Sequence, residues 1–201
     1  LSAIDSLGRL TTEPEEIRHV PAILHSCGVR FVIVEPMPGS KIDGACFWLD
    51  DEATPVIGLT LRQDRIDNFW FVLRHEIEHV LREDGKDEPV VDETDENGLL
   101  TSSATEAAEE AANAAAADFC VPADEMVDFI NRVHPMYSER KIIGFARRVQ
   151  RHPGLVIGQI QNKTRRYDLL RKYLVKVRQI IVQSSLTDGY GVAVPLSASR
   201  S

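Results

Sequence analysis

The chain has 201 residues, of which 43% are hydrophobic, so it is long and apolar enough for one folded domain and wholesale disorder is excluded. It has no apolar stretch near the roughly 20 residues of a membrane-spanning helix, and residues 1–10 lack the basic and apolar parts of a signal peptide, so we expect a cytoplasmic protein. Residues 1–138 carry 10 Lys and Arg against 28 Asp and Glu, whereas residues 139–180 carry 12 against two. The net charge of −8 therefore hides an acidic body and a basic C-terminal part, which predicts two surfaces with different partners.

The first third of the chain predicts a helix followed by a small sheet. Apolar residues recur on one side of residues 13–25, which is typical of an amphipathic helix. Three β-branched and apolar stretches follow, and acidic residues that favour a turn separate the second from the third. The expected strands are residues 29–34, 45–49 and 55–61, with the last two paired antiparallel through a turn at residues 50–53.

A helix over residues 64–81 carries the pattern His-Glu-Ile-Glu-His at residues 75–79. Residues four apart lie on the same face of a helix, so His75 and His79 can bind one metal ion. Glu76, beside the first histidine, can then reach a water on that ion. This H-E-x-x-H pattern predicts a zinc site with His75 and His79 as ligands and Glu76 as the catalytic base.

An acidic stretch and an alanine-rich helix follow this pattern. Residues 83–98 contain eight acidic residues, which favours a solvated loop. A calcium-binding loop is excluded because Ala104 stands where a bidentate Glu is needed. Ser103 and Glu106 have the spacing of a capping box that would open the alanine-rich helix, and Pro122 would end it.

A catalytic zinc ion usually has three protein ligands and one open position, so a third ligand is required. The alanine-rich helix offers Glu106, Glu109 and Glu110, and its small side chains would let it approach the metal-binding helix closely. We choose Glu109 because Asn113 lies one turn later and could orient a ligand histidine. Glu106 and Glu110 remain alternatives.

The C-terminal part predicts more helices and a tail. Helices are expected over residues 124–133 and 139–150, and another from residue 155, where Pro153 suits a first turn. A last amphipathic helix is expected over residues 167–182, followed by a flexible tail over residues 183–201.

The cysteines indicate no disulfide framework. Cys27, Cys46 and Cys120 are odd in number, widely spaced and set among apolar residues. We therefore predict three buried thiols in a reducing compartment and no cysteine-based zinc site.

Residues 109–113 and 119–122 resemble the E-x-E-A-N-x-F-A-x-x-L-L-x-P element of the ImmA/IrrE family of zinc metallopeptidases. The second Glu of that element is Ala111 here and its Phe is Ala115, which favours Glu109 as the metal ligand. The resemblance covers roughly residues 13–122. Further on, residues 137–140 and 152–158 resemble the C-terminal portion of bacterial antitoxin-type regulators that carry this domain.

The resemblance implies an α+β fold with a small mixed or antiparallel sheet of about three strands. This sheet would pack on a helical zincin-like core with additional C-terminal helices. Together with the charge pattern, we expect a peptidase domain at residues 1–138, a basic helical extension at residues 139–182 and a flexible tail at residues 183–201. The implied activity is Zn²⁺-dependent cleavage of a bacterial or phage repressor or antitoxin.

Two questions stay open at this level. A donor for the tetrahedral oxyanion is needed, and His134, Tyr137 and His152 are candidates, although surface positions, or an N-cap role for His152, explain them equally well. The alternative function is a non-proteolytic regulator or sensor with a structural metal site, whose basic segment binds DNA or a partner. Direct binding of nucleic acid is less favoured than a protein partner, and the basic segment could instead clamp onto the chain's own acidic body.

Overall fold

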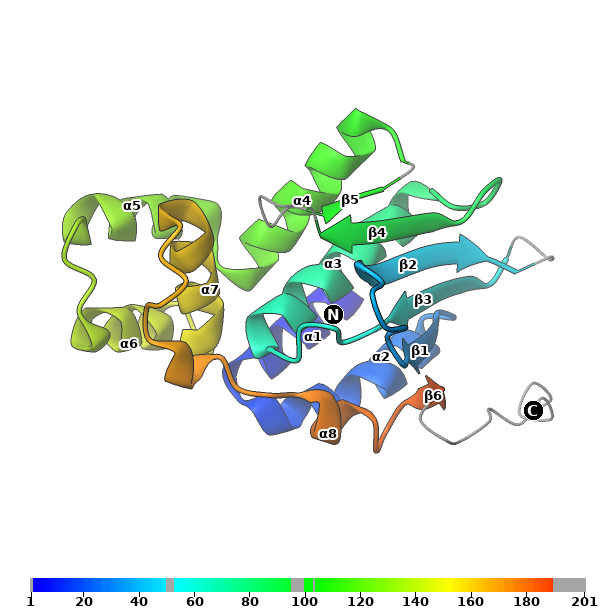
Figure 1. Ribbon diagram of the computed structural model, residues 1–201, viewed down its shortest axis with the longest axis horizontal. Helices are drawn as coiled ribbons and strands as arrows, with labels where there is room; N and C mark the ends of the chain where they lie inside the picture. Colours follow the sequence, from blue (N-terminus) through cyan, green and yellow to red (C-terminus); the bar gives the residue numbers. More distant parts are fainter. Residues whose placement is uncertain (1, 50–52, 95–99, 103, 190–201) are drawn as a thin grey trace.

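The fold is a mixed sheet and a pair of central helices, with a helical end on one side (Figure 1). The computed structural model describes residues 2–49, 53–94, 100–102 and 104–189. Within them the sheet has six strands in the order β5-β4-β2-β3-β1-β6. The strands are β1 Arg30–Val34, β2 Ile42–Trp48, β3 Pro55–Leu59, β4 Val90–Thr94, β5 Leu100–Thr101 and β6 Leu186–Asp188.

Helices make up most of the remainder of the described chain. They are α1 Ala3–Arg9, α2 Val20–Ser26, α3 Ile66–Arg82, α4 Glu106–Cys120, α5 Ala123–Val133, α6 Glu139–Arg148, α7 Pro153–Thr164 and α8 Arg178–Ile181. Short 3-10 helices occur at Leu10–Thr12, Pro14–His19 and Arg171–Tyr173. None of the described helices is long and apolar enough to cross a membrane.

The α+β class is confirmed, but the expectation of about three strands is wrong. The predicted strands are present, with β2 antiparallel to β3 and β1 parallel to β3. The extra strands β4 and β5 lie in and just after the stretch that we expected to be a loop. The charged residues made this stretch resemble a solvated loop in the sequence. In β4, alternate residues such as Val90 and Asp92 face inward, whereas Val91 and Glu93 are exposed.

The C-terminal part also differs from the expectation. Residues 167–182 do not form one amphipathic helix, because this segment crosses from the helical end back to the sheet. Asp64 Oδ1 accepts hydrogen bonds from the backbone N–H of Val177 and of Arg178, which anchors the crossing. Three residues of the expected tail form β6, parallel to β1, and residues 190–201 lie outside the described part.

Other local expectations had mixed outcomes. Residues 13–25 begin as a 3-10 helix and continue as α2 rather than forming one α-helix. Thr105 caps α4, accepting from the backbone N–H of Ala108, whereas Ser103 of the expected capping box and residues 50–52 of the expected turn lie outside the described residues. Cys46 and Cys120 are buried as predicted, but Cys27 is exposed.

The centre of the molecule is the close packing of α3 on α4. One face of α4 presents only small side chains to α3, since Ala108, Ala112 and Ala116 are all buried. The opposing part of α3 is bulky, with Phe69 and Trp70 almost fully buried. Small residues facing large ones let the two backbones approach closely without leaving voids.

The helical end is formed by α5, α6 and α7, and α7 connects it to the centre. Helix α7 packs on α3 and α6, and its residues Leu155, Val156 and Ile157 are buried. The division of the chain at residue 138 stays a prediction.

His152 is the N-cap of α7. Its Nδ1 accepts the backbone N–H of Gly154 at 3.0 Å, and its own backbone N–H donates to the carbonyl oxygen of Thr11 at 2.8 Å. Burial lowers the pKa of His152 below its ordinary value of 6.5, because the charged ring would lose its hydration. A protonated Nδ1 could not accept the hydrogen bond that caps the helix.

The His152 cap predicts a loss of stability in mild acid. As the pH falls below 6.5, the unfolded chain takes up a proton at His152 before the folded chain does, so stability present at neutral pH is lost. We expect His152→Asn, which keeps a capping acceptor that does not titrate, to lose less of its melting temperature than the wild type between pH 7.5 and 5. His25→Asn, at an exposed position on α2, is the control and should follow the wild type. Equal pH profiles for the wild type and His152→Asn would contradict the assignment.

Candidate metal centre

Helix α3 places His75, Glu76 and His79 in the interior of the protein. All three residues have 0% exposed area. The preceding turns of α3 are buried among apolar side chains, so the helix that carries the three residues is held on both sides by packing. Such burial is unusual for ionisable groups unless they are paired or bind a metal ion.

Two further residues converge on these histidines from other elements. Glu109 extends from the first turn of α4 and Asp92 from β4. Potential ligand atoms of His75, His79, Asp92 and Glu109 all lie within 4.8 Å of one another. The structure thus brings together the three predicted ligands, and it adds Asp92, which the sequence analysis placed in a solvated loop.

The spacing of these atoms is that of ligands around one small ion. A tetrahedral zinc ion with bonds of about 2.0–2.1 Å separates its ligand atoms by about 3.3–3.4 Å. The Nε2 atoms of His75 and His79 are 3.0 Å apart, and His75 Nε2 is 3.3 Å from Asp92 Oδ1. The oxygens of Glu109 lie 3.6 Å from His75 Nε2 and 3.5 Å from His79 Nε2. Two imidazoles and two carboxylates at these distances form a donor set that fits Zn²⁺.

Several carboxylate oxygens of the cluster have no hydrogen-bond partner within the part of the protein that the structure describes. Both carboxylate oxygens of Glu76 and of Asp92, and Oε2 of Glu109, are buried without a hydrogen-bond partner among the described residues. Burial and then the negative charge of Asp92 raise the pKa of Glu76 well above its ordinary value. For His79, burial alone would lower the pKa, but the carboxylates of Glu109 and Asp84 outweigh burial and raise it. A bound cation would offset the energetic cost of this buried negative charge.

Glu76 lies against the sheet at a glycine. A Cβ atom added to Gly44 of β2 would lie 2.0 Å from Glu76 Oε1 and 2.8 Å from Val72 Cγ1. Gly44 is also the residue of β2 that pairs with Asp92 of β4. The glycine therefore provides the space that lets the Glu76 carboxylate sit beside the ligands.

The side chains that orient the ligands differ from the prediction for Asn113. Its Nδ2 donates to the carbonyl oxygen of Leu100 at 3.2 Å, so Asn113 holds β5 against α4. His79 is oriented by Asp84, whose Oδ2 lies 3.0 Å from the histidine Nδ1. Glu109 accepts a short hydrogen bond from Ser102. The sequence analysis missed Asp84, just after α3, and Ser102, just after β5, because only the fold brings these residues to the ligands.

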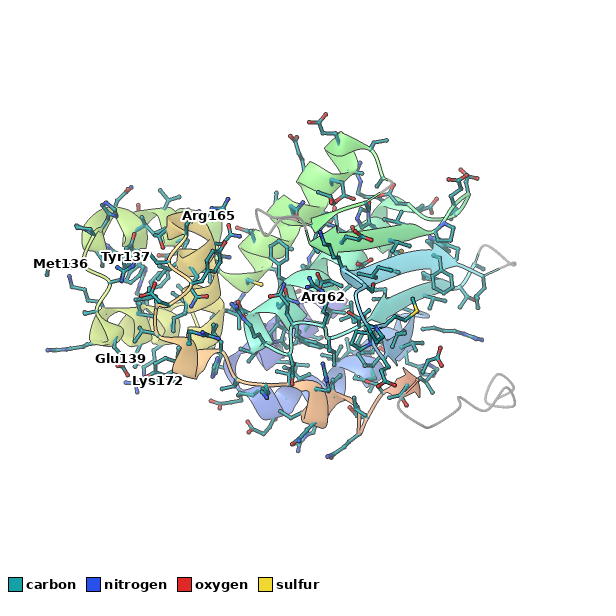
Figure 2. The ribbon with its side chains drawn as sticks, viewed as in Figure 1. Arg62, Met136, Tyr137, Glu139, Arg165 and Lys172 are labelled. Carbon is teal, nitrogen blue, oxygen red and sulfur yellow. The ribbon has the colours of Figure 1, made fainter. Side chains whose placement is uncertain are left out.

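The proposed oxyanion donors are not near the cluster. His134 and Tyr137 contact each other, at 3.3 Å between Nδ1 and the hydroxyl, and line a separate cavity of about 480 Å³. Figure 2 shows Tyr137 at the far side of the helical end. His152 caps α7, as described above. None of the three is brought to the metal ligands.

Glu78, the second acidic residue of the H-E-x-x-H pattern, points away from the cluster. It pairs with Arg74 on the preceding turn of α3, at 2.8 Å from Nη2 to Oε2. Both side chains line an open groove between α1 and α4. Glu78 therefore adds no charge to the ligand cluster.

Comparison with known families agrees with this geometry. The family described as the IrrE N-terminal-like domain, Peptidase M78, matches residues 28–152. The chain belongs to this family. The resemblance noted from the sequence is thereby confirmed, and the matched region contains all five residues of the cluster, namely His75, Glu76, His79, Asp92 and Glu109. A search of curated proteins gave no match.

As a member of this family, the chain has a peptidase-type domain. The cluster of His75, His79, Asp92 and Glu109 in this domain could hold a metal ion. The residues fit such an ion in number, donor chemistry and spacing.

The role of Asp84 can be tested by metal affinity. Removing a partner that orients a ligand histidine typically lowers metal affinity by about 10–100-fold. We expect Asp84→Ala to weaken zinc binding by such a factor, measured by competition with a chromophoric chelator. Asp87→Ala removes the same charge from an exposed position nearby and should leave the affinity unchanged. Equal affinities of the two variants would contradict an orienting role.

Proposed function

We propose that this IrrE-like protein is a zinc-dependent endopeptidase that cleaves a cytoplasmic repressor or antitoxin of a bacterium or phage. The observation that carries the proposal is the position of Glu76. Its carboxylate is fully buried, next to His75 in the chain and close to Asp92 in space. A buried carboxylate beside a metal-ligand cluster is what peptide hydrolysis by an H-E-x-x-H site requires.

In this proposal His75, His79 and Glu109 hold the ion. Bound zinc would supply a Lewis acid that polarises the scissile carbonyl and makes a water molecule acidic. Glu76 accepts the proton of the attacking water on its carboxylate and passes it to the leaving amine. Because the Glu76 carboxylate is shielded from solvent, the proton stays on it between the two steps.

A cavity beside the cluster supports a peptide substrate. It has a volume of about 230 Å³ and lies between α3 and α4, with α7 as its floor. Phe71 is one turn before His75 and Asn113 is one turn after Glu109, so the cavity begins next to the ligands. Its lining is mostly apolar, which suits an uncharged side chain adjacent to the scissile bond. The edge strand β5 offers a place where an extended peptide can pair.

The assigned mechanism predicts that Glu76→Gln separates catalysis from metal binding. Loss of a general base typically costs about 10²–10⁴-fold in rate, so cleavage should fall by at least about 10²-fold. The zinc content of the purified protein, measured by mass spectrometry, should stay at one ion per chain. Cleavage is followed on candidate repressors and antitoxins from the same genome.

Glu78→Gln is the matched control, because Glu78 is two residues away on α3 but pairs with Arg74. This variant should keep both zinc and activity. Retained cleavage by Glu76→Gln would rule out the mechanism.

A second candidate function is the binding of a polyanion by the basic segment. Arg148 pairs with Glu125 of the acidic body, but Lys172 pairs with Glu139 and Arg166 with Asp168 inside the segment itself. Figure 2 shows Glu139 and Lys172 together at the helical end. Of these three ion pairs, only that of Arg148 joins the basic segment to the acidic body. This favours binding of a partner at the exposed basic surface over attachment of the segment to the chain's own acidic body. Since α7 is buried, binding would use the surface of α6 and not a helix inserted into a DNA groove.

If the basic surface binds DNA, the affinity must fall with salt. Each neutralised phosphate contributes about 0.9 to the slope of log affinity against log salt for duplex DNA. Arg140 and Arg147 are exposed and seven residues apart on α6, so they share a face. We expect the double variant Arg140→Gln/Arg147→Gln to reduce that slope by about 2, measured by fluorescence anisotropy. No binding, or an unchanged slope, would dismiss this surface.

A further inference from the structure

Asp92 is the member of the metal cluster that comes neither from the H-E-x-x-H pattern nor from the alanine-rich helix α4. Its side chain has no exposed area, and its Oδ1 lies 3.3 Å from His75 Nε2. This distance falls among the other ligand–ligand distances in the cluster. We infer that Asp92 is the fourth ligand of the resting metal site, so that the position needed for catalysis is closed until a substrate displaces it. The catalytic consequence rests on the proposed peptidase function.

A simple hydrogen bond between His75 and Asp92 does not account for the arrangement. One ring nitrogen, His75 Nε2, has three neighbours at 3.0–3.6 Å, namely Asp92, Glu109 and His79 Nε2. An imidazole nitrogen has one proton or one lone pair, so it cannot serve three neighbours by hydrogen bonding. Two Nε2 atoms 3.0 Å apart also cannot both carry a proton that points into the cluster. All these atoms can share one cation.

The position of Asp92 is fixed by the sheet. Gly44, Ala45 and Cys46 of β2 pair with Asp92, Val91 and Val90 of β4, and β2 continues into the centre of the sheet (Figure 1). The backbone behind the carboxylate is therefore held on a rigid element. Displacement of Asp92 as a ligand needs rotation of its side chain or movement of β4.

The chain at and just after β5, the strand that pairs with β4, makes two hydrogen bonds to α4. Leu100 of β5 accepts a hydrogen bond from Asn113, and Ser102 donates one to Glu109. Ser102 therefore holds the ligand Glu109, and Asn113 holds β5 one turn further along α4. A substrate strand that paired with the edge strand β5 would lie next to the neighbour of β4, the strand that carries Asp92, and so could shift β4 and release Asp92.

Structural zinc sites are closed by four protein ligands, whereas catalytic sites keep one position open. A resting site closed by Asp92 would have four protein ligands, like a structural site, and would open a position for catalysis only when substrate binds. Such a site would keep the peptidase inactive in the absence of its substrate. Carboxylates suit this role because they can give up a bond to a metal without moving the backbone.

The test measures coordination in the full-length protein loaded with Co²⁺, whose visible spectrum reports its ligands. Acetohydroxamate, a ligand that needs an open position, is titrated into the wild type, Asp92→Ala and Asp92→Asn. We expect both variants to bind it at least about tenfold more tightly than the wild type, and to bind the metal itself at least about tenfold more weakly. Glu93→Ala removes a charge from the exposed neighbour on β4 and should match the wild type.

Equal acetohydroxamate affinity in the wild type and both Asp92 variants would overturn the inference, because the fourth position would then be open already. A second measurement needs no variant. Infrared difference spectra of wild-type protein labelled with ¹³C in the aspartate carboxylates should show a shifted aspartate band when zinc binds, and absence of any shift would also overturn the inference. Neither readout depends on proteolysis, so failure of the Glu76→Gln experiment would refute the peptidase mechanism while leaving the result on Asp92 intact.

Discussion

Three carboxylates and two imidazoles lie close together in the interior, and the rest of the structure is arranged around that concentration of charge. Glu76, Asp92 and Glu109 approach His75 and His79 closely, and several of their oxygens have no partner among the described residues. Burying an unpaired carboxylate costs several kcal/mol even after the protein relaxes. A divalent cation held by these residues would offset this cost, and folding of the core would then be coupled to binding of the ion.

Each surrounding element has a feature that serves this pocket. Helix α4 approaches α3 through alanines, which brings Glu109 within reach of both histidines. Strand β2 presents Gly44 where any side chain would collide with Glu76. Strand β4 points Asp92 inward because its other face is solvated. Asp84 follows the end of α3 and returns to His79, so the second histidine is held by the chain that leaves its own helix.

The helical end has a different physical character. Residues 139–180, which include α6 and α7, carry 12 Lys and Arg against two acidic residues, whereas residues 1–138, which include the central helices and all strands but β6, are acidic. Helix α7 nevertheless fastens this end to α3 through buried apolar residues. The peptidase-type centre and the basic surface therefore belong to one packed body, and a partner held at the basic surface would be tethered to the same molecule as the metal cluster.

Local patterns in the sequence determined the parts that depend on local physics. The four-residue spacing of His75 and His79 places both on one helical face in any fold, and the alanines near Glu109 favour close helix packing. Asp92 could not be found this way, because its inward direction depends on pairing of β4 with β2, and its charge resembled that of a solvated loop. Proximity of His134, Tyr137 and His152 to the site could not be judged either, since none lies on an element that carries a ligand. The sequence by itself determined the helix that carries His75, Glu76 and His79; the tertiary structure alone placed the Asp92 carboxylate beside them, because contacts between distant strands and helices arise only when the chain packs.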